Sequence, residues 1–304
     1  MMMGNNIYHI PVLLHDAVAG LITDPSGVYV DVTFGGGGHS SEILNQISNK
    51  GKLVAFDQDA DALNNVLEDE RFVFVPQNFA FVKNNLRLLR LMPVDGLLAD
   101  LGVSSHQFDT ADRGFSFRFD AVLDMRMDKK GSLDARKVLN EYDEVKLFEI
   151  FKLYGELKNA RSIASRVVYK RADKPFKTIE DLKSALYNLA PRMKENRFFA
   201  QVFQALRIEV NQEMEVLKVL LEQMEDVIKK EGRIVFITYH SLEDRMVKNF
   251  IKTGNVAGEL EKDFFGNVLR PFKEVNRKPM ISDEKELVAN PRARSAKMRI
   301  AERI

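Results

Sequence analysis

The stretch Val28-Tyr29-Val30-Asp31-Val32-Thr33-Phe34-Gly35-Gly36-Gly37-Gly38-His39 decides the fold of this chain. It opens with an apolar run typical of a buried strand, and four glycines follow it. A glycine turn between a strand and a helix lets the backbone come close to a bound nucleotide. A second apolar run ends at Asp57, about 20 residues later, where a doubly wound fold presents a carboxylate to ribose hydroxyls. Together the two segments predict a cofactor built on adenosine.

The glycine pattern separates two cofactor classes. The dinucleotide fingerprint G-x-G-x-x-G is not matched, because Ser40 stands at its last glycine. The acidic-x-G-x-G-x-G pattern of methyltransferases that use S-adenosylmethionine fits at Asp31, Gly35 and Gly37. It departs from that pattern at Thr33. A plain structural turn stays an alternative, and so does a nicotinamide-dependent oxidoreductase, which the broken fingerprint disfavours.

The composition is that of a soluble globular protein. The chain has 304 residues, too many for one small core, and 45% of them are apolar. It has no cysteine, which excludes disulfides and thiolate metal sites and fits a reducing compartment. His9, His15 and His39 lack the spacing of metal ligands, so no metal is expected. No signal peptide or membrane-spanning run is visible, and a cytoplasmic enzyme is predicted.

Charge is distributed unevenly on a chain of net charge +1. Lys and Arg outnumber Asp and Glu by 10 to 4 over residues 161–197, and by 10 to 5 over residues 270–304. Two separate basic segments could bind a phosphate backbone. Solvated helix faces and a charged tail explain the same charges equally well.

The first hundred residues alternate short apolar runs with helical patterns. Strands are predicted at 28–34, 52–57, 71–76 and 94–100, with helices between them such as 40–47 and 59–67. This rhythm is typical of a parallel sheet covered by helices. It stops between Asp109 and Ala200, where the patterns are helical and no buried strand is evident.

The sheet is expected to resume after this helical stretch. Apolar residues recur at helical spacing from Leu206 to Ile228, which predicts one long amphipathic helix that Gly232 ends. Residues 233–237 then read as a buried strand. Residues 272–278 and 297–303 are predicted to form a final antiparallel pair.

Two strand ends carry candidate chemistry. The fourth strand ends at Asp100, and ligands of open α/β sheets bind beyond the carboxyl ends of strands. Asp100 is therefore a candidate site residue, although it could instead cap the next helix. After the fifth strand, Ser241 and Glu243 read as a helix N-terminus. His240 could face the same cleft, or it could be an ordinary packing residue.

A set of longer motifs runs along the chain. They read HIPVLL at 9–14, DVTFGGGGHS at 31–40, DLGVSS at 100–105, RGFSF at 113–117, LDMRMD at 123–128, FQALRI at 203–208, HSLEDR at 240–245 and NPRARSA at 290–296. Together they resemble the bacterial 16S ribosomal RNA cytosine-N4 methyltransferases of the MraW/RsmH type. The resemblance extends from His9 to Arg303 and rests on motifs that rarely occur together.

The resemblance implies a fold and a reaction. The fold would be a Rossmann-like class I methyltransferase sheet, formed by residues 1–108 and 201–304, with an inserted all-helical domain at 109–200 for substrate recognition. The reaction would methylate the N4 amine of one cytidine in the decoding region of 16S rRNA, in the small ribosomal subunit, with S-adenosylmethionine as donor. Neither DNA nor a membrane is an expected partner, and monomer and homodimer stay open.

The family's functional positions carry over to particular residues. The implied cofactor contacts are Gly37, Gly38, His39, Asp57, Phe79, Asp100 and Gln107. Asp57 would meet the ribose, Phe79 would pack near the adenine, and Asp100 would be the catalytic residue that accepts hydrogen bonds from the target amine.

RNA contacts are proposed from residue type. The candidates are Arg113, Phe115 and Arg126 near the start of the insertion, and Arg292 and Arg294 in the tail. A packed domain junction with satisfied arginines is the alternative for the first three. A non-catalytic RNA-binding protein that has kept the fold is the alternative for the whole chain.

The chain departs from the family at two places. Members often read His-Pro-Ala-Thr-Arg before the 203–208 motif, where this chain has Lys194, Glu195 and Asn196. The usual proline after the paired serines is His106. Neither departure touches an implied cofactor position, and both bear on RNA contacts.

Overall fold

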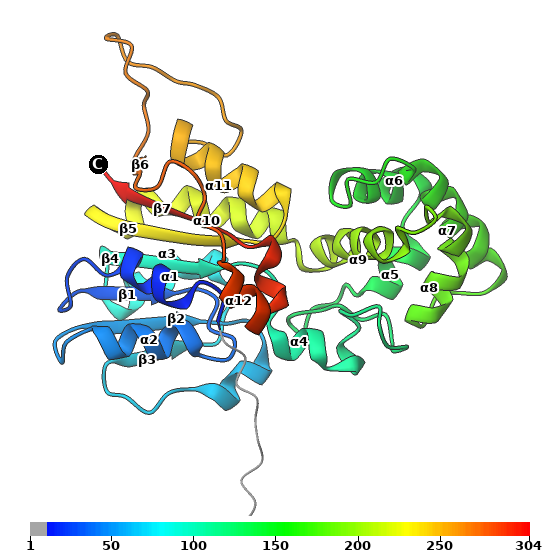
Figure 1. Ribbon diagram of the computed structural model, residues 1–304, viewed down its shortest axis with the longest axis horizontal. Coiled ribbons are helices and arrows are strands. Elements are labelled where there is room, and N and C mark those ends of the chain that lie inside the picture. The colour runs from blue at the N-terminus through cyan, green and yellow to red at the C-terminus, as the bar shows by residue number, and fades with distance from the viewer. Residues whose placement is uncertain (1–10) are drawn as a thin grey trace, which may run out of the picture. The chain divides into compact units, whose positions relative to one another are not determined.

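The computed structural model describes residues 11–304, so the motif residues His9 and Ile10 lie outside the described range. The chain divides into two compact units (Figure 1). The sheet unit joins the chain up to Gly102 with Glu215–Ile304, and the helical unit is Val103–Met214. The sequence-based domain boundaries at residues 109 and 200 both fall inside the helical unit. Among the described residues, no helix is long and apolar enough to span a membrane.

The sheet unit contains one seven-stranded sheet of order β3-β2-β1-β4-β5-β7-β6. The strands are β1 (Val28–Asp31), β2 (Lys52–Phe56), β3 (Phe72–Val75), β4 (Val94–Asp100), β5 (Ile228–Thr238), β6 (Phe272–Glu274) and β7 (Lys297–Arg303). Strands β1 to β5 are parallel, and β7 runs antiparallel to both β5 and β6. The strand order reverses between β1 and β4, and this switch point is where open α/β sheets bind ligands.

Helices cover both faces of the sheet. Successive strand residues point to opposite faces, so Leu97 and Leu98 belong to different core clusters. Figure 1 shows α1 (Leu14–Leu21) and α2 (Gly38–Gln46) on one face. The other face packs against α3 (Val82–Leu89), α10 (Glu213–Val227) and α11 (Ser241–Thr253). The fold is therefore the doubly wound α/β class that the sequence predicts.

The helical unit has a hydrophobic core of its own. Its helices are α4 (Ser105–Asp109), α5 (Ala135–Glu141), α6 (Glu144–Leu153), α7 (Ala160–Asp173), α8 (Ile179–Leu186) and α9 (Glu195–Asn211). Phe151, Leu182 and Val202 are fully buried in it. Within residues 103–214, all of which the structure describes, no strand occurs and a single bridge joins Val122 to Thr178.

The long helix predicted from Leu206 to Ile228 is wrong, because two helices occupy this stretch. Helix α9 ends at Asn211, and Gln212 adopts a left-handed conformation with φ of 51°. Helix α10 then begins at Glu213. The apolar spacing continues across the break, so periodicity alone does not reveal it.

Two further expectations are corrected. Gly232 does not end a helix but lies inside β5, where an added Cβ would come 2.9 Å from the backbone oxygen of Asp95. Residues between Ile228 and Arg233 form a bulge against β4, which needs a small residue at this close approach. The helix predicted at 59–67 is a short 3-10 helix, Ala60–Asn65. The final antiparallel pair is confirmed, with the first strand ending at Glu274.

Candidate functional site

The glycine turn between β1 and α2 has the backbone shape that only glycine adopts easily. Gly35 and Gly37 have φ values of 51° and 76°, the left-handed region that side chains disfavour. A Cβ on Gly38 would lie 2.2 Å from Cγ of Pro11. A Cβ on Gly36 would meet no atom within 4 Å, so open space lies beside this residue. The turn therefore leaves room for a ligand at the carboxyl end of β1.

Asp57 lies directly after β2 and supports this turn. Its Oδ2 accepts a hydrogen bond of 2.7 Å from the N–H of Gly35, and its Oδ1 accepts one of 2.8 Å from the N–H of Asp59. Removal from water raises the pKa of Asp57 to about 6, against the lowering effect of these two donors. A carboxylate has about four acceptor positions, so two remain for ribose hydroxyls.

Asp31 and Thr33 connect the turn to the neighbouring elements. Asp31 is buried, and it accepts hydrogen bonds of 2.7 Å from Oγ of Ser40 and 3.0 Å from the N–H of Thr33. Burial raises the pKa of Asp31. Oγ1 of Thr33 accepts a 2.7 Å hydrogen bond from the N–H of Asp100. The threonine that departs from the glycine pattern thus joins the ends of β1 and β4.

Asp100 ends β4 and lies beside two polar side chains. The hydroxyl of Tyr239 donates a 2.7 Å hydrogen bond to Oδ1 of Asp100. Nδ1 of His39 lies 3.8 Å from Oδ2, and Nε2 of the same ring lies 3.1 Å from the backbone oxygen of Val12. Burial raises the pKa of Asp100 to about 6, while His39 and the Tyr239 hydroxyl lower it. The carboxylate is partly exposed, with 22% of its side chain accessible.

Asp100 does not cap the next helix, which was the alternative role for this residue. The cap of α4 is Ser104, whose Oγ accepts from the N–H of Gln107, while Oε1 of Gln107 accepts from the N–H of Ser104. Asp100 is therefore available at the strand end. The same capping pair engages Gln107, whose role as a cofactor contact stays a prediction.

Tyr239 is the site residue that the sequence did not single out. It follows β5 immediately, and β5 is the parallel neighbour of β4, so both strand ends lie at one edge of the sheet. The sequence drew attention to His240 and Ser241 instead. His240 caps α11, and its Nε2 lies 3.0 Å from Oε1 of Glu243. Helix α11 begins at Ser241, as expected.

Phe79 opens a 3-10 turn after β3, at the same edge of the sheet. It is half-buried and packs against the hydrophobic cluster that includes Val82 and Leu86 of α3. Its proposed position near an adenine ring stays a prediction.

The arginines proposed to contact RNA differ in their surroundings. Arg113 and Phe115 are each only 5% exposed. The Arg113 guanidinium donates to the backbone oxygens of Arg126 and Met127, at 2.9 and 3.1 Å. Arg126 forms an ion pair of 2.7 Å with Asp124. This arrangement favours the alternative of packed residues with satisfied arginines for all three, and their RNA contacts stay predictions.

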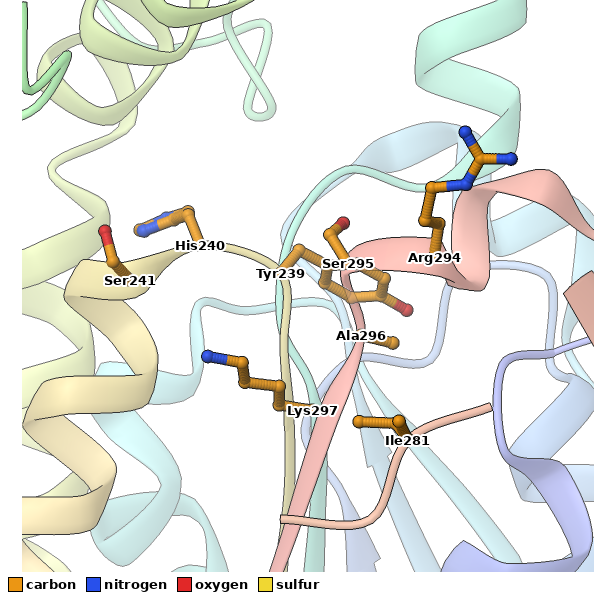
Figure 2. Close-up of a pocket in the computed structure, with 8 residues that line it drawn as sticks. All are labelled: Tyr239, His240, Ser241, Ile281, Arg294, Ser295, Ala296 and Lys297. Carbon is orange, nitrogen blue, oxygen red and sulfur yellow. The ribbon is translucent and has the colours of Figure 1, made fainter. Parts of the chain in front are cut away.

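The tail arginines lie at the surface of the sheet unit. Arg292 and Arg294 belong to a short 3-10 helix, Pro291–Ser295, where Arg294 is exposed and Arg292 is partly buried. A cavity of about 270 Å³ opens beside this 3-10 helix (Figure 2). Its lining residues are Tyr239, His240, Ser241, Ile281, Arg294, Ser295, Ala296 and Lys297.

A doubly wound sheet with a glycine turn after its first strand is the arrangement of the S-adenosylmethionine-dependent methyltransferases. The chain belongs to the MraW methylase family, whose sequence model matches residues 6–304. Ribosomal RNA small subunit methyltransferase H of Flavobacterium johnsoniae is 56% identical over 297 residues, which cover 98% of each chain. The protein of the same name from Phocaeicola vulgatus is 54% identical over 297 residues, again 98% of each chain.

Proposed function

We propose that this protein transfers a methyl group from S-adenosylmethionine to the N4 amine of a cytidine in the decoding region of 16S rRNA. Its relatives carry the name ribosomal RNA small subunit methyltransferase H, which supports RNA of the small ribosomal subunit as the substrate. The observation that carries the proposal is Asp100, a carboxylate fixed by Tyr239 at the switch point of a methyltransferase sheet. The reaction takes place in the cytoplasm, where ribosomal subunits are.

The residues at the edge of the sheet fit the cofactor. The open space beside Gly36 and the spare acceptor positions of Asp57 suit an adenosine with its ribose diol. The residues that would hold the cofactor are Gly37, Gly38, His39, Asp57, Phe79, Asp100 and Gln107. The cofactor supplies an activated methyl group on a sulfonium, so the protein chiefly has to align the acceptor amine.

Asp100 prepares the amine. The lone pair of a cytosine amine is delocalised into the ring, and hydrogen bonds from the amino group to a carboxylate draw it outward. The carboxylate also offsets the positive charge that develops on nitrogen. Oδ1 accepts from Tyr239, so the carboxylate keeps further acceptor positions for the amine. With a pKa of about 6, Asp100 is mostly ionised at neutral pH.

The RNA is bound by basic surfaces outside this centre. A base inside a stack cannot reach the methyl group, so the target cytidine leaves its stack, which costs least in irregular or single-stranded RNA. Arg292 and Arg294 offer phosphate contacts from the tail. The helical unit, with its basic segment 161–197, is the substrate-recognition part of the proposal.

The test is methyl transfer from labelled S-adenosylmethionine to small subunits that lack the modification, followed by nucleoside analysis. Labelled N4-methylcytidine is expected from the unaltered protein. Asp100→Asn should lower kcat by about 10²- to 10³-fold at saturating S-adenosylmethionine, which separates its effect on the reaction from any loss of cofactor affinity. Asp16→Asn, an exposed carboxylate on α1, is the matched control. Full activity of Asp100→Asn with unchanged cofactor affinity would remove Asp100 from the mechanism.

A further inference from the structure

A cavity lies at the carboxyl end of β5 in the sheet unit, and none of the proposed cofactor contacts lines it. Its walls come from two segments, residues 239–241 after β5 and residues 294–297 leading into β7, and Ile281 closes one side (Figure 2). Its volume of about 270 Å³ is below the ~300–1,000 Å³ of a typical small-molecule pocket. It is therefore suited to a fragment of a larger ligand.

The lining has the chemistry of a sugar–phosphate site. Lys297 and Arg294 supply positive charge, and the hydroxyl of Ser295 can donate a hydrogen bond to an anionic oxygen. Figure 2 shows Lys297 reaching toward α11 while Arg294 points away from that helix. Two cations on different sides of one cavity suit a strand with repeated phosphates better than a single anion.

The acidic groups near the cavity have partners of their own. Asp244 pairs with Arg299 at 2.7 Å and with Lys297 at 3.5 Å, so one carboxylate is shared between two cations. Glu243 accepts from the N–H of Tyr239 at 2.9 Å and lies 3.0 Å from His240. Arg294, which is exposed, adds a cation on the other side of the cavity.

Tyr239 places the cavity next to the proposed reaction centre. Its side chain lines the cavity, and its hydroxyl donates to Asp100. A ligand in the cavity is thus separated from Asp100 by one aromatic side chain. For a polymer substrate, a nucleotide in the cavity would therefore lie close to the one that reacts.

We infer that this cavity binds one sugar of the RNA strand beside the target cytidine, with Lys297 and Arg294 on the two phosphates that flank this sugar. The inference rests on the proposed methyl transfer to RNA, and it assigns a subsite that the cofactor and Asp100 do not define.

The test compares two double variants of the full chain. Arg294→Gln with Lys297→Gln removes both cavity cations. Lys50→Gln with Lys230→Gln removes two exposed lysines elsewhere on the sheet unit and is the matched control. For each, cofactor affinity is measured by calorimetry, KM and kcat are measured on unmodified small subunits, and binding is measured against salt concentration.

The cavity variant should keep its cofactor affinity and kcat while KM rises about tenfold or more, the cost of a lost charge-assisted contact. The slope of log affinity against log salt should fall by about 1 to 2. Ethylation interference on 16S rRNA should lose its signal at phosphates adjoining the target cytidine and nowhere else.

Equal KM values and salt slopes in the two double variants would overturn the subsite, and so would an unchanged interference pattern. If the unaltered protein binds no S-adenosylmethionine and transfers no methyl group, the proposed function fails and the subsite fails with it. Calorimetry on the unaltered protein distinguishes these two failures.

Discussion

Tyr239 donates one hydrogen bond to Asp100. Removing this bond tests whether Tyr239 controls the ionisation of Asp100. Because the phenol donates to the ionised carboxylate, it lowers the pKa of Asp100, and Tyr239→Phe should move that pKa above about 6. As the pH is lowered, methyl transfer by the variant should therefore begin to decline at a higher pH than methyl transfer by the unaltered protein. We expect a loss of about five- to tenfold near pH 6.5 that shrinks as pH rises. The measurement is kcat/KM against pH.

The control for this variant is Tyr29→Phe, a buried tyrosine of β1 whose hydroxyl donates to the backbone oxygen of Asp24. It should lower stability and leave the pH profile unchanged. An equal loss of activity at every pH in Tyr239→Phe would reduce Tyr239 to a packing role.

The proposed role of Asp57 predicts that cofactor binding depends on pH. Its pKa of about 6 in the free protein is raised by removal from water, and donors from a ribose favour its ionised form. Binding should thus release a proton when the pH is near 6. Affinity for S-adenosylmethionine should rise between about pH 5 and 7 and then level off. Calorimetry over this range tests it, and an affinity that is flat with pH would disconnect Asp57 from the cofactor.

At the scale of the element, the β1–α2 turn allows two glycines to be compared. Gly37 has φ of 76°, so Gly37→Ala should destabilise the fold by about 1–2 kcal/mol. Gly36 has open space beside it, so Gly36→Ala should leave stability within about 1 kcal/mol. The same methyl should lower cofactor affinity, because it enters the space assigned to the ligand.

Thermal unfolding and calorimetry on the same two proteins make the comparison. If Gly36→Ala bound S-adenosylmethionine as tightly as the unaltered protein, the open space beside that residue would not belong to the cofactor.

Some of the elements could be predicted from the sequence and others could not. Apolar runs predicted β1 to β5 because a parallel strand buried on both faces leaves an unbroken apolar signature. The break at Gln212 was missed, since a left-handed residue that is not glycine carries no signal and the apolar spacing runs on. Tyr239 was missed for a different reason. Its contact with Asp100 joins residues 139 positions apart, and no local pattern encodes that pairing.

At the scale of the molecule, each unit has its own hydrophobic core, and the two should respond separately to core damage. Leu182 is fully buried in the helical unit. Leu182→Ala should lower the free energy of unfolding of the helical unit by about 2–5 kcal/mol. Hydrogen exchange followed by mass spectrometry should become faster across Val103–Met214 and stay unchanged in β1 to β5.

Leu98→Ala, at a fully buried position of β4, is the reciprocal control and should affect only the sheet unit. Faster exchange in both units from either change would mean that the chain unfolds as one cooperative block.

The sheet has a consequence for how the protein is made. β4 and β5 are neighbours in the sheet, yet the helical unit separates them along the chain. During translation the first four strands emerge early, and β4 then waits with one edge unpaired until β5 leaves the ribosome. At about 5–20 residues per second this interval is on the order of ten seconds. An open strand edge invites wrong pairing, so the pace at which the helical segment is synthesised should govern the yield of folded protein.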